Sequence, residues 1–216
     1  MMMQNFRFFC VALLFITGLA HAQEQHISHI KAGLNAIVEL GEKERKQHQA
    51  ILDELMEQAE ALLQAHPQEP KALVWHAVVY EQYANYRGGF TGVKLAKQAR
   101  ENLEAAIAQA PEGEAGLAYL TLGLLYERTP GWPVAFGSIR HADEMYAKAI
   151  EIRPQGVDIN YQYARFLKGI ERKEEAFQYA QKALEATPRP TLEAFDKAQQ
   201  QLALKLVGAN KDASAK

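Results

Sequence analysis

A repeated pattern of small and apolar residues that ends at a proline limits the folds open to this chain of 216 residues more than any other feature. In one copy Ala99, Leu103 and Ala106 stand at positions i, i+4 and i+7, which is one face of a helix. Proline then ends the helix, because it has no N–H to donate. The copies run from Leu55 to Pro67 (the weakest), from Ala99 to Pro111, from Ala142 to Pro154 and from Ala176 to Pro188. A repeat of this length indicates stacked helical units rather than separate domains.

A second pattern, large-x-x-large-small-x-x-Tyr, precedes two of these copies, at Leu73–Tyr80 and Tyr119–Tyr126, with a looser version at Asn160–Leu167. Together the two patterns resemble the tetratricopeptide repeat over Pro67–Pro188. The resemblance implies an all-α, right-handed α-solenoid of about three helix pairs with terminal helices. Such pairs stack because one pair cannot bury its apolar face alone.

The spacing of the prolines predicts where the solenoid departs from the family. Successive prolines lie 44, 43 and 34 residues apart, and only the last distance equals the family's 34-residue repeat. We therefore expect long turns at residues 85–92 and 129–139. Around the repeats at 67–188 we expect N-terminal capping helices at 23–66, a C-terminal helix at 189–209 and a disordered tail at 210–216. Thr191 is a predicted N-cap of that last helix, whose apolar stripe would be Phe195, Gln199, Leu202 and Leu206.

The first residues are typical of a cleavable signal peptide, which we predict at 1–22. Arg7 precedes an apolar run that is too short to span a bilayer, and the run ends in Ala20-His21-Ala22. Cleavage would remove Cys10, the only cysteine, and would leave a net charge of −3. We therefore expect a periplasmic protein without thiol chemistry. The charge balance argues against a nucleic-acid partner, and no later segment predicts membrane insertion.

The second predicted turn, Pro130–Ser138, contains Trp132 and Phe136 among glycines and prolines. With the residues up to Leu167 it resembles periplasmic repeat proteins of TRAP (tripartite ATP-independent periplasmic) transporters, the T component. The resemblance implies an accessory protein that oligomerises and partners a solute-binding protein. The lipoprotein cysteine often expected of that group is absent here. Two interpretations of the aromatic residues stay open: packing against the repeats, or docking of a partner.

By its resemblance to the tetratricopeptide repeat, the chain should have a concave groove lined by the first helix of each pair. An apolar floor beside a charged end would suit a protein or peptide partner, or an apolar or carboxylate small molecule. The alternative is that the terminal helices fill this groove. The candidate binding residues of groove and turn are Val74, Val78, Glu81, Leu120, Leu124, Arg128, Trp132, Phe136, Tyr161, Arg165 and Lys168.

We find no pattern that predicts catalysis. His26 and His29 are spaced like two metal ligands on a helix but lack a third. His76 occupies a repeat-core position, where a packed and hydrogen-bonded histidine is expected. No Gly-x-Ser-x-Gly turn and no His-Glu-x-x-His helix occurs. The sequence therefore predicts a non-enzymatic scaffold with no cofactor and no metal, and self-association is left open.

Overall fold

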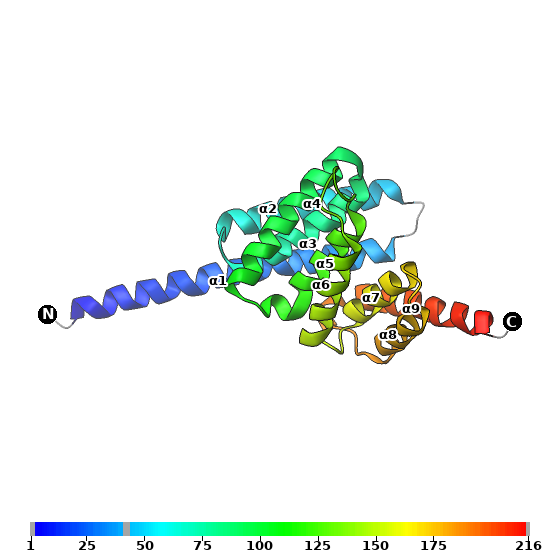
Figure 1. Cartoon of the computed structure of the whole chain (residues 1–216). Helices are drawn as coiled ribbons and strands as arrows, with labels where there is room; N and C mark the ends of the chain where they lie inside the picture. The colour runs from blue at the N-terminus through cyan, green and yellow to red at the C-terminus, as the bar shows by residue number, and fades with distance from the viewer. Residues whose placement is uncertain (1–2, 41–43, 215–216) are drawn as a thin grey trace.

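The computed structural model describes residues 3–40 and 44–214, which form helices and connecting turns without a β-strand. The chain is the all-α solenoid that the repeats predict, and Figure 1 shows its helices stacked into one elongated body. The helices are α1 (Met3–Glu39), α2 (Arg45–Ala65), α3 (Pro70–Arg87), α4 (Gly89–Gln109), α5 (Leu117–Arg128), α6 (Ile139–Ile152), α7 (Val157–Gly169), α8 (Lys173–Glu185) and α9 (Glu193–Ser214). Short 3-10 turns lie at η1 (Gly113–Gly116) and η2 (Pro190–Leu192).

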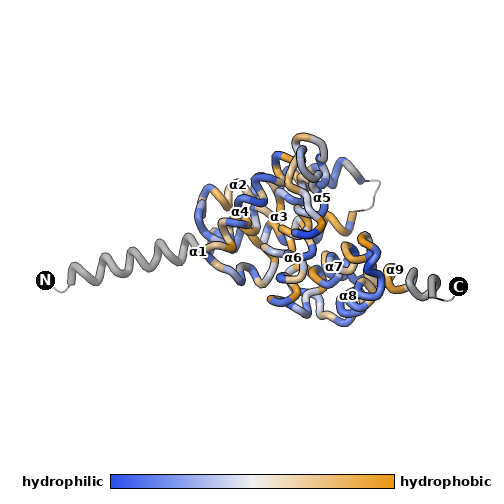
Figure 2. Tube along the Cα trace, in the orientation of Figure 1, coloured by the Kyte–Doolittle hydropathy of each residue, from blue (hydrophilic) through white to orange (hydrophobic). Residues whose placement is uncertain are grey.

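The three repeats are the pairs α3–α4, α5–α6 and α7–α8. The residues that define the repeat pattern in the second helix of each pair are almost completely buried. They are Ala99, Leu103, Ala106, Ala142, Tyr146, Ala149, Ala176, Ala180 and Ala183. Figure 2 shows hydrophobic residues recurring among hydrophilic ones along these helices, as amphipathic helices require. The small side chains among them let neighbouring helices approach closely.

The first predicted turn, at residues 85–92, does not exist as a loop. Helix α3 continues to Arg87, Gly88 separates the two helices, and α4 begins at Gly89; the two glycines have positive φ values of 61° and 56°. Further along α4, a Cβ atom on Gly92 would lie 2.7 Å from the carbonyl oxygen of Ala84, so glycine allows the two helices to cross closely. The extra residues of the first repeat therefore lengthen α3 and α4 to 18 and 21 residues, whereas α7 and α8 have 13 each.

The second predicted turn lies outside the helices, from Thr129 to Ser138. Ser138 caps α6 by accepting a hydrogen bond from the backbone of His141 at 3.3 Å. The Trp132–Pro133 peptide bond is cis. The residues between α5 and α6 (129–138), called the α5–α6 loop below, are thus the longest described connection between the repeat helices.

Asn35 of α1 hydrogen-bonds the chain at η2 and at the start of α9. Its amide donates to the backbone oxygen of Thr191 at 3.1 Å, and its oxygen accepts from the backbone N–H of Phe195 at 3.1 Å. Thr191, the predicted N-cap, instead lies within η2. The apolar stripe of α9 also differs from the prediction, because Ala203 and Val207 are buried while Leu202 is 43% exposed.

Both ends of the chain are helical where the structure describes them. Helix α1 runs without a break past Ala22, and its first turns project from the body (Figure 1). The signal peptide at 1–22 stays a prediction. Helix α9 continues to Ser214, so most of the predicted disordered tail is helix. Among the described residues, no helix combines the length and apolar character needed to cross a membrane.

Candidate functional site

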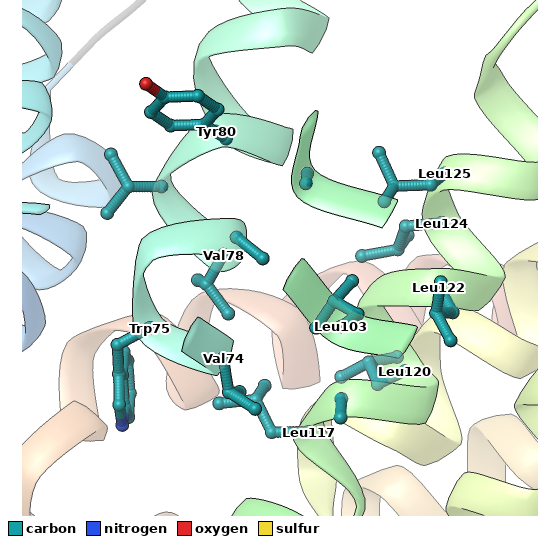
Figure 3. Packing of buried hydrophobic residues seen from close by; sticks show 14 of the residues in the cluster. Val74, Trp75, Val78, Tyr80, Leu103, Leu117, Leu120, Leu122, Leu124 and Leu125 are labelled. Atoms are coloured by element: carbon teal, nitrogen blue, oxygen red, sulfur yellow. The ribbon is translucent and has the colours of Figure 1, made fainter. Parts of the chain in front are cut away.

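The floor of the predicted groove is core. Val74 is fully buried, and Val78, Leu120 and Leu124 are each less than a tenth exposed. Figure 3 shows Val74 and Val78 on α3 directed toward the helix that carries Leu120 and Leu124. Of the two alternatives that the sequence left open, the structure therefore supports the closed groove.

The terminal helices close the groove. Leu34 from α1, Leu192 from η2 and Phe195 from α9 pack into the cluster that holds the groove floor. What remains among them is a cavity of about 50 Å³, which also contacts Trp75 and Leu120. This volume holds only a few water molecules, so an extended peptide does not fit.

Most of the polar residues predicted to orient a partner are engaged inside the protein. Arg128 Nη1 donates to Glu81 Oε1 at 2.6 Å, and the carboxylate of Glu81 is almost completely buried. Arg165 Nη2 donates to Glu127 Oε2 at 2.7 Å. Tyr161 is buried in a small cluster with α9, and only Lys168 points freely to solvent.

Tyr146 completes the Glu127 pair from the side of the core. Its hydroxyl donates to Glu127 Oε2 at 2.6 Å. Burial, followed by the charge and hydrogen bond of Glu127, raises the pKa of Tyr146 well above its ordinary value, so the hydroxyl stays protonated. Glu127 therefore joins Tyr146 of the core and Arg165 of the predicted groove in one hydrogen-bonded network.

The α5–α6 loop is held in place by backbone hydrogen bonds and one aromatic ring. The N–H of Gly137 donates to Pro130 at 2.9 Å, and that of Ser138 donates to Tyr126 at 2.8 Å. The ring of Phe136 meets the ring of Tyr126 edge to face with 5.6 Å between centroids. The guanidinium of Arg100 lies 4.5 Å from the centroid of the Phe136 ring. Phe136 therefore packs the loop against the repeats.

Trp132 has the opposite position in the same loop. Its side chain is 90% exposed, and Val134 beside it is 56% exposed. Phe90, in the first turn of α4, is also 90% exposed. Large apolar side chains this exposed, on a loop fixed by backbone bonds, are typical of surfaces that another molecule covers.

Phe90 and Val134 line a cavity of about 370 Å³, called the turn pocket below, whereas Trp132 lies on the same loop as Val134 but outside the lining. It lies between the α3–α4 turn and the α5–α6 loop. Its lining is mainly apolar, with Glu81 and Arg128 as the charged residues. The apolar part of the lining includes Phe90, Val93, Leu124, Leu125, Pro130 and Val134. This volume is within the range of ligand-binding and anchor-residue pockets.

The histidines do not form a metal centre in the part of the chain that the structure describes. His26 is hydrogen-bonded to Gln58 at 2.9 Å, while His29 is exposed. His76 is buried and meets the side chain of Asn102 at 2.9 Å, as expected for a core histidine. No group of three His, Cys, Asp or Glu side chains among the described residues could hold a metal ion.

The sequence did not single out Phe90 as a binding residue. Its neighbourhood contains Gly88 and Gly89, which predicted a loop in which any aromatic residue could be buried or exposed. One signal was available: in a helix beginning at Gly89, Phe90 stands opposite the buried face of Ala96 and Ala99.

Comparisons with known proteins show the fold. No protein-family model and no curated protein sequence matches the chain. Among solved structures, the thermophilic TPR protein TTC0263 of Thermus thermophilus is similar, with a TM-score of 0.53 and 17% identity over 83% of this chain and 87% of that chain. The structure of MamA has a TM-score of 0.47 and 16% identity over 81% of this chain and 98% of that chain. The likeness to TTC0263 shows that the fold is of the tetratricopeptide type.

Proposed function

We propose that the protein is a non-enzymatic scaffold that binds a protein partner through the turn pocket and its exposed aromatic rim. The observation that carries the proposal is the position of Trp132 and Phe90. Both are 90% exposed; Phe90 lines the apolar pocket of about 370 Å³, and Trp132 lies on the α5–α6 loop between Pro130 and Val134, which also line it. Tryptophan side chains in such positions contribute much of the binding energy in protein interfaces.

The closed groove supports the same assignment by elimination. A tetratricopeptide groove would bind through residues such as Val74 and Leu120, which here are buried against the terminal helices. Opening it would expose the apolar faces of α1 and α9 to water. The turn pocket requires no such rearrangement, because exposed residues of its lining, Phe90 and Val134, already face solvent.

The test is affinity capture with full-length wild type and two variants from extracts of the native cells. Trp132→Ala/Phe90→Ser removes the exposed aromatic side chains without touching the core. Leu204→Ala, a 60% exposed residue on α9, is the matched control. We expect one protein recovered in stoichiometric amount by wild type and by the control, and lost with the double variant. Equal recovery by all three proteins would refute the turn pocket as the docking surface.

Two finer expectations belong to this proposal. We propose export to the periplasm by the predicted signal peptide at 1–22, supported by the sequence around Ala20–Ala22. We also propose that the partner is the solute-binding protein of a TRAP-type transporter, supported by the resemblance over Thr129–Leu167. Amino-terminal sequencing of the exported protein tests the first, with Gln23 as the expected first residue. Identification of the captured protein tests the second.

A second candidate is a carrier of an apolar or carboxylate small molecule, now in the turn pocket instead of the groove. The observation that favours it is Arg128, which lines the pocket and makes its hydrogen bond to Glu81 through Nη1. Native mass spectrometry of the protein purified from its own cells distinguishes the two. A stoichiometric small molecule that is lost in Val93→Asp would favour the carrier.

A further inference from the structure

The charge around the turn pocket differs from the charge of the whole chain. The protein has a formal net charge of −2, yet residues 82–100 and 128–142 contain no aspartate and no glutamate. These two segments carry six basic residues, which are Arg87, Lys94, Lys97, Arg100, Arg128 and Arg140. The acidic residues of the same helices lie outside these two segments, as Glu81 on α3 and Glu101 and Glu104 on α4 do, and Glu81, which also lines the pocket, is paired with Arg128.

Three of these basic residues form no ion pair, although Glu101 follows Lys97 by one helical turn. Arg87, Lys94 and Lys97 are exposed, and in the described part of the chain none of them forms an ion pair. The other three are engaged, since Arg100, Arg128 and Arg140 pair with carboxylates. The free positive charge therefore lies on the last turn of α3 and the first turns of α4.

The helical spacing places this charge beside the exposed aromatic residue. Lys94 and Lys97 follow Phe90 by four and seven residues, so all three lie on one face of α4. Val93, which lines the turn pocket, borders the same face. A molecule that fills the pocket and covers Phe90 would therefore meet both lysine side chains. We call Arg87, Lys94 and Lys97 the basic rim.

We propose, resting on the proposed function above, that the turn pocket receives an apolar side chain from an acidic segment of the partner protein. The carboxylates of that segment would lie against the basic rim, while its apolar anchor displaces water from Val93, Leu125 and Val134. Complementary charge at a rim speeds association and selects the partner, while apolar burial in the pocket supplies the affinity.

The pocket favours a protein segment over an anionic lipid surface. Exposed aromatic residues with flanking lysines also occur on proteins that lie on membranes. A flat bilayer surface would cover Trp132 and Phe90 but leave the turn pocket of about 370 Å³ unfilled. A single apolar side chain of a partner can enter that cavity and pack against its lining.

The test selects a random dodecapeptide phage library on the immobilised full-length protein. Four proteins are compared: wild type, Phe90→Ser, Lys94→Glu/Lys97→Glu, and the matched control Lys182→Glu/Lys205→Glu on α8 and α9. All substituted positions are exposed, and circular dichroism checks that each variant is folded. Fluorescent copies of the enriched peptides are then titrated at low and high salt.

We expect the enriched peptides to be net acidic and to contain a large apolar residue. Their affinity should fall about tenfold in Lys94→Glu/Lys97→Glu, fall with rising salt, and stay unchanged in the control. Neutral or basic peptides, no enrichment, or equal binding to the charge-reversed variant would overturn it. If partner capture still depends on Trp132 while the peptides are not acidic, the docking surface stands and only its acidic chemistry fails.

Two further measurements test whether a lipid surface or a second copy of the chain covers the turn pocket and the basic rim instead. Wild type is sedimented with vesicles of phosphatidylglycerol and phosphatidylethanolamine, and its mass in solution is measured by light scattering. Vesicle binding, or an oligomer, that is lost in Lys94→Glu/Lys97→Glu without peptide enrichment would overturn the proposal in favour of a lipid surface or a second copy.

Discussion

The two tryptophans of the chain provide a matched pair of perturbations, because one is core and the other is surface. Trp75 is 3% exposed, and its indole N–H donates to Glu114 at 3.2 Å. Trp132 is 90% exposed. We expect Trp75→Ala to destabilise the protein strongly and Trp132→Ala to leave its stability almost unchanged.

The magnitudes follow from the buried areas. A tryptophan side chain buries about 200 Å² when fully enclosed, which at about 25 cal/mol per Å² is about 5 kcal/mol. Trp75 is nearly at this limit, and truncation of core aromatic residues costs about 3–5 kcal/mol. Trp132 buries about a tenth of its side chain, so the same reasoning gives about 0.5 kcal/mol.

Urea unfolding of both variants, followed by circular dichroism, measures the two free energies. Each variant also retains a single tryptophan as a fluorescent reporter. The emission of Trp75 in Trp132→Ala should be shifted to the blue relative to that of Trp132 in Trp75→Ala. A loss above about 2 kcal/mol in Trp132→Ala would place Trp132 in the core and refute the docking surface.

Three other changes test the closed groove and its polar network by the same unfolding assay. Leu120→Ala should cost about 2–5 kcal/mol, because the groove floor is core; a cost below about 1 kcal/mol would show an open groove. Arg189→Ala should lower the free energy of unfolding by about 3–5 kcal/mol. It removes the guanidinium whose Nη2 lies 2.6 Å from Oδ1 of the fully buried Asp196. An unchanged free energy of unfolding would show that the last helix docks weakly. Burial lowers the pKa of His76 below 6.5, although the charge of Glu60 acts in the opposite direction. His76 therefore binds a proton more readily in the unfolded chain than in the folded protein. The free energy of unfolding should therefore fall as the pH is lowered from about 7.5 to about 5.5, and it should fall less in His76→Gln. An equal dependence on pH in both proteins would exclude His76 as the cause.

The repeats were predictable because their pattern is local. Ala142, Tyr146 and Ala149 stand on one helix face within eight residues, and all three are buried. The closed groove was not predictable in this way. It depends on contacts such as that between Asn35 and Phe195, which are 160 residues apart and leave no periodic signal.

The two predicted turns show that a glycine-rich sequence does not always mark a loop. Gly88 and Gly89, both with positive φ, reverse the chain where α4 starts, so the sequence Gly88–Gly92 is a helix start rather than a loop. In the α5–α6 loop the glycines do mark irregular backbone. Sequence alone left open which of its aromatic residues packs, and the structure shows Phe136 against Tyr126 with Trp132 exposed.

Site-specific photo-crosslinking in the native cells tests the central claim most directly. A photoreactive phenylalanine analogue would replace Phe90, Trp132, Gln82 beside the small groove cavity, or Leu204 on α9. We expect a protein partner to be cross-linked to the residue at position 90 or 132, and no partner to be cross-linked to the residue at position 82 or 204. A partner cross-linked from position 82 but not from 90 or 132 would show that the groove opens and binds, and would contradict the account.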